Sequence, residues 1–146
     1  MNFMEEAIKV AQRSTHKRYM MGCVIVQRAE IISKGFQHSG TWRMRELFSM
    51  HAELHALFNL RHKRGQLSES TVYIAGIARK SGNVVPALPC VCCATALMHA
   101  GIYTVRYTSP VITVQSGENY FAETRYATYK IYLPDELENL KTYPAP

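Results

Sequence analysis

The chain has 146 residues, of which 47% are apolar, and its 17 Lys and Arg against 11 Asp and Glu give a formal net charge of +6. This length suits one globular domain, so we expect a single domain over residues 1–146. Acidic residues near the N-terminus and the lack of a long apolar run argue against a signal peptide and a membrane span, which predicts a soluble, cytoplasmic protein with no membrane partner. The positive charge suits a phosphate-bearing substrate or a nucleic acid, but it is also common in proteins that bind neither.

The first part of the chain predicts one helix followed by two strands. Apolar residues recur at helical spacing over residues 3–13. Residues 22–26 are an apolar run typical of a buried strand, and residues 30–36 predict its partner. Cys23, within the first strand, is most simply a small buried residue.

A polar and basic loop over residues 37–45 leads to a second predicted helix at residues 51–63. Ser49 is in position to cap this helix. The apolar side chains that we expect on its core-facing side are Leu54, Leu57, Phe58 and Leu60.

The second half predicts a strand at residues 71–75, a short helix at 93–100 and a strand at 102–107. The order of elements indicates an α/β domain, with a mixed sheet and helices on its faces. Residues 111–133 alternate apolar and polar side chains and predict either more strand or an irregular segment. Residues 135–140 predict a short terminal helix.

The four cysteines indicate a metal site rather than disulfides, because Cys90, Cys92 and Cys93 are packed into one short segment. Cys90 and Cys93 stand three positions apart at the start of a predicted helix. Both sulfurs therefore point to one side, and the helix N-terminus favours their ionised form. His51, at the start of another predicted helix, supplies a third ligand if the two helices lie side by side. Three ligands leave the fourth tetrahedral position of Zn²⁺ open, as in catalytic zinc sites.

Glu53 lies two residues after His51 and points elsewhere around the helix, so it can stand beside the metal without ligating it. Zinc lowers the pKa of a coordinated water to near neutrality. A neighbouring carboxylate can take the proton of that water, pass it to a ring nitrogen and then protonate a departing amine. Glu53 is therefore the candidate catalytic residue of a hydrolytic deamination.

Two other kinds of zinc protein are less favoured. A structural site needs a fourth ligand, for which Cys92 or His55 would have to serve, but Cys92 points away from the face that its neighbours share and His55 lies one turn beyond His51. A metalloprotease is disfavoured because the His51–His55 segment is not H-E-x-x-H: its glutamate stands one position late.

The combination of H-x-E with P-C-x-x-C resembles the cytidine and deoxycytidylate deaminase superfamily. The similarity runs over residues 22–107 and includes the strand at 22–26, the turn at 35–37 and the run at 100–105. The resemblance implies a cytidine-deaminase-like, three-layer α/β/α fold with a mixed, about five-stranded sheet. It also implies His51, Cys90 and Cys93 as zinc ligands, Glu53 as proton shuttle and, by analogy, a homo-oligomer.

Departures from the family pattern bear on the substrate. Many relatives have Asn where Gln37 stands, and that amide contacts the sugar or base, so Gln37 and the motif residue Ala52 are candidate substrate-binding residues. The similar tRNA adenosine deaminases usually have Glu where this chain has Leu88, and residues 78–88 are longer here than in those enzymes. The motifs thus do not fix the substrate.

Three more candidate substrate-binding residues lie in the loop before His51. Arg43 and Arg45 could meet a substrate phosphate, and Trp42 could offer a stacking face. A solvated loop with one anchoring aromatic residue is the favoured alternative for this segment.

We hypothesise a zinc-dependent deaminase of a free cytosine nucleoside or nucleotide, with deoxycytidylate (dCMP to dUMP) favoured because the chain is basic near the site. A less favoured alternative is a deaminase of bases in RNA or single-stranded DNA, which requires a basic, aromatic track leading to the zinc; the sequence shows only scattered residues of that kind. Another amino-heterocycle, such as a guanine or a pterin, is a further alternative. A non-catalytic zinc-bearing interaction domain is disfavoured because it has no use for Glu53.

Overall fold

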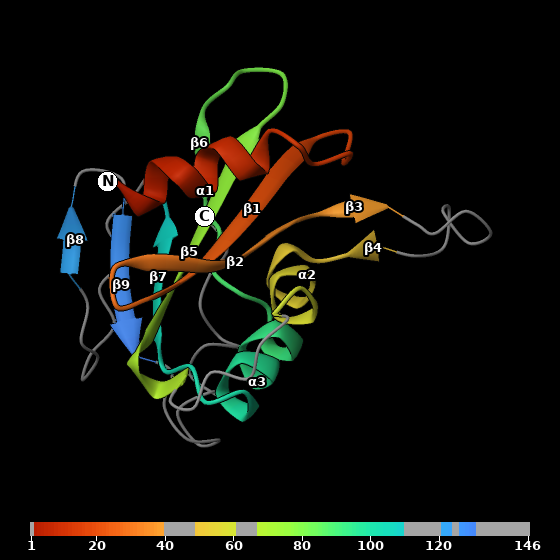
Figure 1. The fold of residues 1–146 in the computed structure, drawn as a ribbon. Coiled ribbons are helices and arrows are strands. Elements are labelled where there is room, and N and C mark those ends of the chain that lie inside the picture. The colour runs from red at the N-terminus through yellow and green to blue at the C-terminus, as the bar shows by residue number, and fades with distance from the viewer. Residues whose placement is uncertain (1, 40–48, 61–66, 110–120, 124–125, 131–146) are drawn as a thin grey trace.

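The computed structural model describes residues 2–39, 49–60, 67–109, 121–123 and 126–130 (Figure 1). Three α-helices are present in these residues, together with a short 3₁₀ turn at Leu67–Glu69: α1 (Phe3–Ala11), α2 (Ala52–Phe58) and α3 (Val91–His99). The strands are β1 (Tyr19–Gln27), β2 (Glu30–Phe36), β3 (His38–Ser39), β4 (Ser49–Met50), β5 (Ser70–Ala78), β6 (Val84–Val85), β7 (Thr104–Thr108), β8 (Phe121–Glu123) and β9 (Tyr126–Lys130).

The main sheet has the strand order β2-β1-β5-β7-β9-β8, and the short β6 also pairs with β5. β5 and β7 are parallel, whereas the other pairs are antiparallel. Five of these strands (β1, β2, β5, β7 and β9) have five or more residues. The predicted mixed, about five-stranded sheet is therefore confirmed, with β6 and β8 as short additions.

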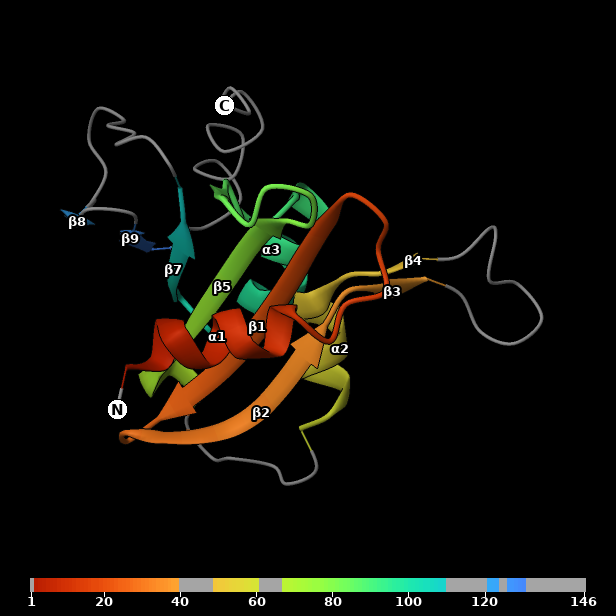
Figure 2. The same ribbon diagram turned by 90° about the horizontal axis from the view of Figure 1, so that it is seen from above.

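Helices cover both faces of the sheet, as predicted (Figure 2). Alternate side chains of a strand point to opposite faces, which divides the core in two. On one face Val24 and Val26 of β1 pack with α1; on the other Cys23 and Ile25 pack with α2 and α3. Cys23 is fully buried, as its apolar surroundings predict. The result is a three-layer α/β/α domain.

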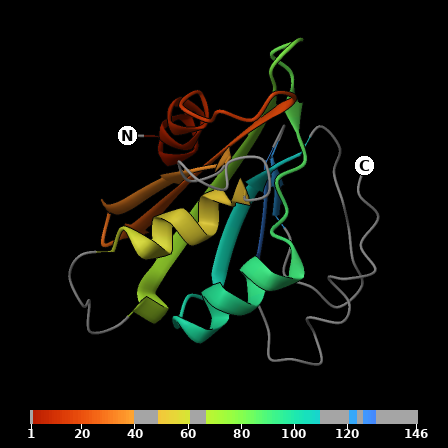
Figure 3. The same cartoon turned by 90° about the vertical axis from the view of Figure 1, so that its right-hand side faces the viewer.

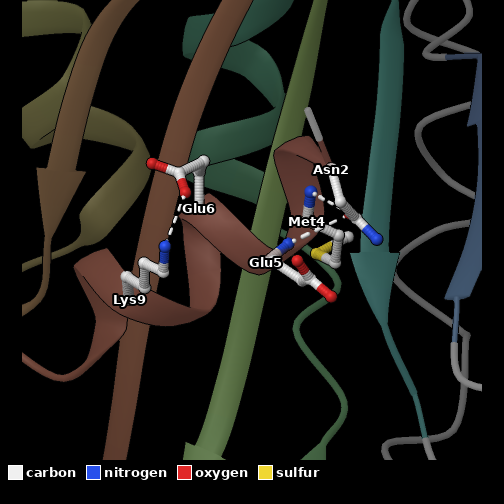
Figure 4. Close-up of polar contacts among 5 residues, drawn as sticks. All are labelled: Asn2, Met4, Glu5, Glu6 and Lys9. Carbon is white, nitrogen blue, oxygen red and sulfur yellow. Dashed lines mark hydrogen bonds and ion pairs between the residues drawn. The ribbon is translucent and has the colours of Figure 1, made fainter.

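Helix α1 begins at Phe3 because Asn2 caps it. The Oδ1 of Asn2 accepts hydrogen bonds from the backbone N–H groups of Met4, at 3.0 Å, and Glu5, at 3.2 Å (Figure 4). These bonds satisfy donors that have no partner inside the helix. The ion pair between Lys9 Nζ and Glu6 Oε2 measures 3.1 Å but involves an exposed lysine, so it contributes little to stability.

Two glycines allow helices to approach the sheet at backbone distance. A Cβ at Gly22 would lie 2.3 Å from the backbone N of Ala11 in α1, and one at Gly35 would lie 2.3 Å from that of Ala56 in α2. Such separations are far inside van der Waals contact. Each glycine therefore sets the position of one helix, on opposite faces of the sheet.

The structure corrects the prediction for α2. Ser49 lies in β4, and the N-cap residue is His51. The helix ends at Phe58 rather than at residue 63, although residues 61–66 lie outside the described part of the chain. Phe58 is 81% exposed, so its placement on the core-facing side was wrong.

The close contact at Gly35 explains the correction, because only alanine-sized side chains fit between α2 and the sheet. Ala52 and Ala56 are fully buried there. Leu57 and Leu60 pack against the core from the side, as predicted. Small residues thus occupy the position that helical periodicity assigned to large ones.

The remaining elements lie close to their predicted positions. Helix α3 begins earlier than predicted, with Cys90 as its N-cap residue, and Gly101 follows it with φ +93°. A positive φ is readily adopted only by glycine. The alternation over residues 111–133 includes β8 and β9, and the predicted helix at 135–140 lies outside the described residues. Within the described residues, no helix is both long and apolar enough to span a bilayer.

We predict that Gly35→Ala and Gly22→Ala each lower the free energy of unfolding by about 1–3 kcal/mol, because each forces a helix away from the sheet. Only Gly35→Ala should also reduce the zinc that the purified protein retains, since α2 carries His51. Urea unfolding and metal analysis measure the two effects. Equal zinc retention in both variants would contradict this account of Gly35.

Candidate metal centre and pocket

Helices α2 and α3 lie side by side against one face of the sheet (Figure 3). α2 begins directly after His51, and α3 begins directly after Cys90. Both N-cap residues have extended backbone conformations, with ψ values of 152° and 168°. The side-by-side arrangement that the motif spacing required is therefore present.

The ligand atoms of His51, Cys90 and Cys93 all lie within 4.8 Å of one another. His51 Nδ1 is 3.3 Å from Cys93 Sγ and 3.6 Å from Cys90 Sγ. Zn–N bonds of about 2.0–2.1 Å and Zn–S bonds of about 2.3 Å in a tetrahedron separate nitrogen and sulfur by about 3.6 Å. The spacing and the N, S, S donor set therefore fit a zinc ion.

The two thiols differ in their protonation. A hydrogen bond from the Cys93 thiol, joined by one from the Cys93 backbone N–H at 3.5 Å, lowers the pKa of Cys90 to about 5. The same thiol contact and burial raise the pKa of Cys93 well above its usual range. Cys90 is therefore the ligand that ionises more readily.

Two other residues that could have completed a four-ligand structural site do not join the cluster. His55 Nδ1 accepts a hydrogen bond from the backbone N–H of Phe36 at 3.1 Å, which ties α2 to the end of β2. Cys92 is exposed on α3. Among the described residues, the cluster of potential ligands thus has the three members expected of a catalytic zinc site.

Glu53 is buried beside these ligands, with only 6% of its surface exposed. Burial raises the pKa of its carboxyl from 4.5 to about 7, against a smaller lowering by hydrogen bonding and by His51. A carboxyl with a pKa near neutrality can both accept and release a proton under physiological conditions. The carboxylate is not one of the clustered ligand atoms, and its role as a proton carrier stays a prediction.

A cavity of about 210 Å³ opens at this centre. His51, Glu53 and Cys90 line it together with Gln37 and Ala52, the two described residues proposed as substrate contacts. The backbone of Gln37 is fixed, because its N–H donates to Met21 O at 2.9 Å and its carbonyl accepts from Thr15 N–H at 3.2 Å. Trp42, Arg43 and Arg45 lie outside the described residues.

Sequence reasoning did not predict four apolar residues of the cavity wall: Met21, Ile74, Ala87 and Leu88. Of these, Leu88 was noted only as a departure from the family pattern. Strand alternation contained part of the signal, because Met21 lies two residues before Cys23 and so shares its face of β1. Ala87 and Leu88 follow β6 in an irregular segment, where no periodicity marks them.

Comparisons with known proteins agree with this geometry. The family model for the cytidine and deoxycytidylate deaminase zinc-binding region matches residues 1–109. No curated protein matches the chain. Among solved structures, the apo dCMP deaminase from the cyanophage S-TIM5 is similar with a TM-score of 0.59 and 22% identity, over 73% of this chain and 79% of that one.

Two further structures are similar in fold. The same cyanophage enzyme in complex with dCMP and dUMP has a TM-score of 0.56 and 21% identity, over 72% of this chain and 76% of that one. A cytidine deaminase from Burkholderia pseudomallei has a TM-score of 0.50 and 17% identity, over 72% of this chain and 79% of that one. At such identities, these likenesses show the fold.

We predict about one zinc per chain in protein purified without chelators, and its loss in Cys90→Ala and Cys93→Ala. Cys92→Ala is the matched control, because Cys92 lies between the two ligands but is exposed. It should retain the metal of the wild type. Metal analysis by mass spectrometry distinguishes the variants, and zinc loss on replacing Cys92 would refute the three-ligand assignment.

Proposed function

The chain belongs to the cytidine and deoxycytidylate deaminase zinc-binding family, and from this premise we propose that it is a hydrolytic deaminase that converts dCMP to dUMP with release of ammonia. The observation that carries the proposal is the buried Glu53 carboxyl beside the three clustered ligands in one cavity. We further propose a cytoplasmic homo-oligomer.

In this proposal His51, Cys90 and Cys93 hold the zinc ion. When bound there, zinc supplies a Lewis acid that lowers the pKa of water to about 7. The ionised Cys90 thiolate favours the cation, and the hydrogen bonds at the N-terminus of α3 hold both sulfurs on one side.

Glu53 moves the proton. It accepts a proton from the attacking water and delivers it to the ring nitrogen beside the reacting carbon. It then carries a further proton of that water to the departing amine, which leaves as ammonia while the carbon becomes a carbonyl. A carboxyl whose pKa is about 7 is suited to both the basic and the acidic step.

The cavity supports a cytosine substrate. Met21, Ile74 and Leu88 provide apolar walls for a flat ring, and the fixed Gln37 offers an amide in the place where many relatives have Asn. The cyanophage enzyme with the same fold binds dCMP and dUMP, which supports the nucleotide over the nucleoside. The net charge of +6 agrees with a phosphate-bearing substrate.

A non-catalytic zinc domain is less well supported. Burying an ionisable carboxyl costs stability unless its charge is compensated, and Glu53 is 6% exposed with a raised pKa. Such a cost is typical of functional sites.

Purified protein should release ammonia from dCMP faster than from deoxycytidine, cytidine, guanine or adenosine. The apolar cavity walls and Gln37 favour a cytosine ring, and the positive charge favours the phosphate. A coupled ammonia assay and chromatography of the uracil product measure this preference. Turnover of deoxycytidine at the rate of dCMP would leave the deaminase assignment standing but exclude nucleotide preference.

Glu53→Gln should lower kcat for the best substrate by about 10²–10⁴-fold, because the amide cannot carry the proton. The variant should keep its zinc and melt at or above the wild-type temperature, since burying a neutral amide avoids the cost of burying a charge. Calorimetry and metal analysis serve as controls for folding. A folded, zinc-loaded variant with wild-type turnover would eliminate the proton-shuttle role.

A further inference from the structure

Exposed cations gather at the end of the sheet that carries Met21 and Gln37 of the cavity wall. They come from the loop between α1 and β1 and from the turn between β5 and β6, which lie at the same end of the molecule (Figures 1 and 2). We call this set the cationic rim: Arg13, Lys17, Arg18, Arg79 and Lys80.

Neither of the two segments that carry the rim, residues 12–18 and 79–83, contains an acidic residue. In the described part of the chain, the ion pairs join Lys9 to Glu6 and Arg28 to Glu69, and neither pair includes a residue of the rim. Glu30 begins β2, at the far end of the β1–β2 hairpin from the cavity. The charged side chains of the two rim segments are therefore all positive.

The rim is held in place and is connected to the cavity. The Arg79 guanidinium donates to the carbonyls of Ser14, at 2.6 Å, and His16, at 2.9 Å, and its backbone N–H donates to Arg18 O at 2.8 Å. Thr15 N–H donates to the carbonyl of Gln37, a residue of the cavity wall. These bonds tie the two basic segments into one surface beside the pocket.

An exposed aromatic residue adjoins the rim. Along one face of β1, Cys23 is buried in the core, Met21 lines the cavity and Tyr19 comes next outward. Tyr19 is 46% exposed, and its ring is stacked on that of His16 with centroids 6.3 Å apart and an interplanar angle of 20°. Tyr19 is thus a presented ring next to the pocket.

We propose that Tyr19 and the cationic rim form a surface, beside the cavity, that binds a single-stranded nucleic acid. Positive side chains that follow a backbone and an exposed ring on which a base stacks are the two components of single-strand binding. Five cations on two segments exceed what one phosphate of a free nucleotide requires. A base within a duplex would first have to leave the stack to reach the cavity.

This inference goes beyond the proposed function. Strand binding by the rim does not depend on the deamination proposed for the cavity. It is tested by fluorescence anisotropy with the full chain and a labelled, cytosine-containing single-stranded DNA of about twelve nucleotides, a length within the range of about 4–16 nucleotides that one single-strand-binding domain covers. The variants are the double substitution Lys17→Gln/Arg18→Gln, Tyr19→Ala and Tyr19→Phe. The control is the double substitution Arg28→Gln/Arg106→Gln, which removes the same charge from the β1–β2 hairpin and from β7, outside both rim segments.

We expect Lys17→Gln/Arg18→Gln to weaken strand binding about tenfold and to reduce the slope of log Kd against log salt by about 1.4, or about 0.7 for each phosphate contact. Tyr19→Ala should weaken binding about tenfold, and Tyr19→Phe should restore it because the ring is kept. The control should bind like the wild type. All variants should keep the wild-type melting temperature, since the substituted side chains are exposed.

Rim variants that bind the strand as well as the control, or a wild type that does not bind at low salt, would overturn the proposal. So would rim variants that raise KM for dCMP and leave strand binding unchanged, because the rim would then serve the phosphate of a free nucleotide. Strand binding that responds as expected in a protein that does not deaminate dCMP would support the inference and refute the proposed substrate.

Discussion

The contact between the backbone of α2 and Gly35 of β2 is the constraint on which the site depends. A Cβ at this glycine would clash with the carbonyl oxygen of Ala52, so the helix rests on the strand at a distance that only glycine permits. Hydrogen bonds from Asn59 to Lys34 O, and from Phe36 N–H to His55, hold the same helix. The position of His51 at its start follows from these contacts.

A helix fixed in this way places His51 and Glu53 in different surroundings. His51, the N-cap residue, has an extended backbone and turns its Nδ1 toward the cysteines of α3. Glu53, two residues later, is buried in the helix and faces the cavity. The candidate ligand and the proposed proton carrier are thus close in sequence but differ in environment: His51 is half-buried and beside thiols, whereas Glu53 is desolvated with a raised pKa.

The cavity and the cationic rim have a common origin in the antiparallel pairing of β1 with β2 and β5. That register places Tyr19 opposite Ala78 and Gly22 opposite Phe36, so the loop before β1, the exit of β2 and the turn after β5 meet at one end of the sheet. The residues of the metal centre lie just inside this end. A positive surface beside the cavity favours anionic ligands through long-range attraction.

Much of the fold was predictable because buried and exposed side chains alternate along a strand, and apolar residues recur at regular spacing along a helix. The predicted bounds of β2, for example, are the observed ones. The metal ligands were predictable for a chemical reason, since few arrangements other than zinc binding explain one histidine and two cysteines at helix starts. Periodicity failed for Phe58, because it counts apolar residues but does not register that a glycine on the facing strand admits only alanine.

The amino-acid sequence by itself determined the donor set and the class of fold, and it singled out Glu53 as the candidate proton carrier, because these depend on local spacing. The tertiary structure decided what surrounds them. Arg18 and Arg79 are scattered residues in the sequence and become neighbours only when β1 pairs with β5. Sequence spacing cannot reveal such a surface, since strand pairing brings together residues whose separation along the chain is set by the loops between them.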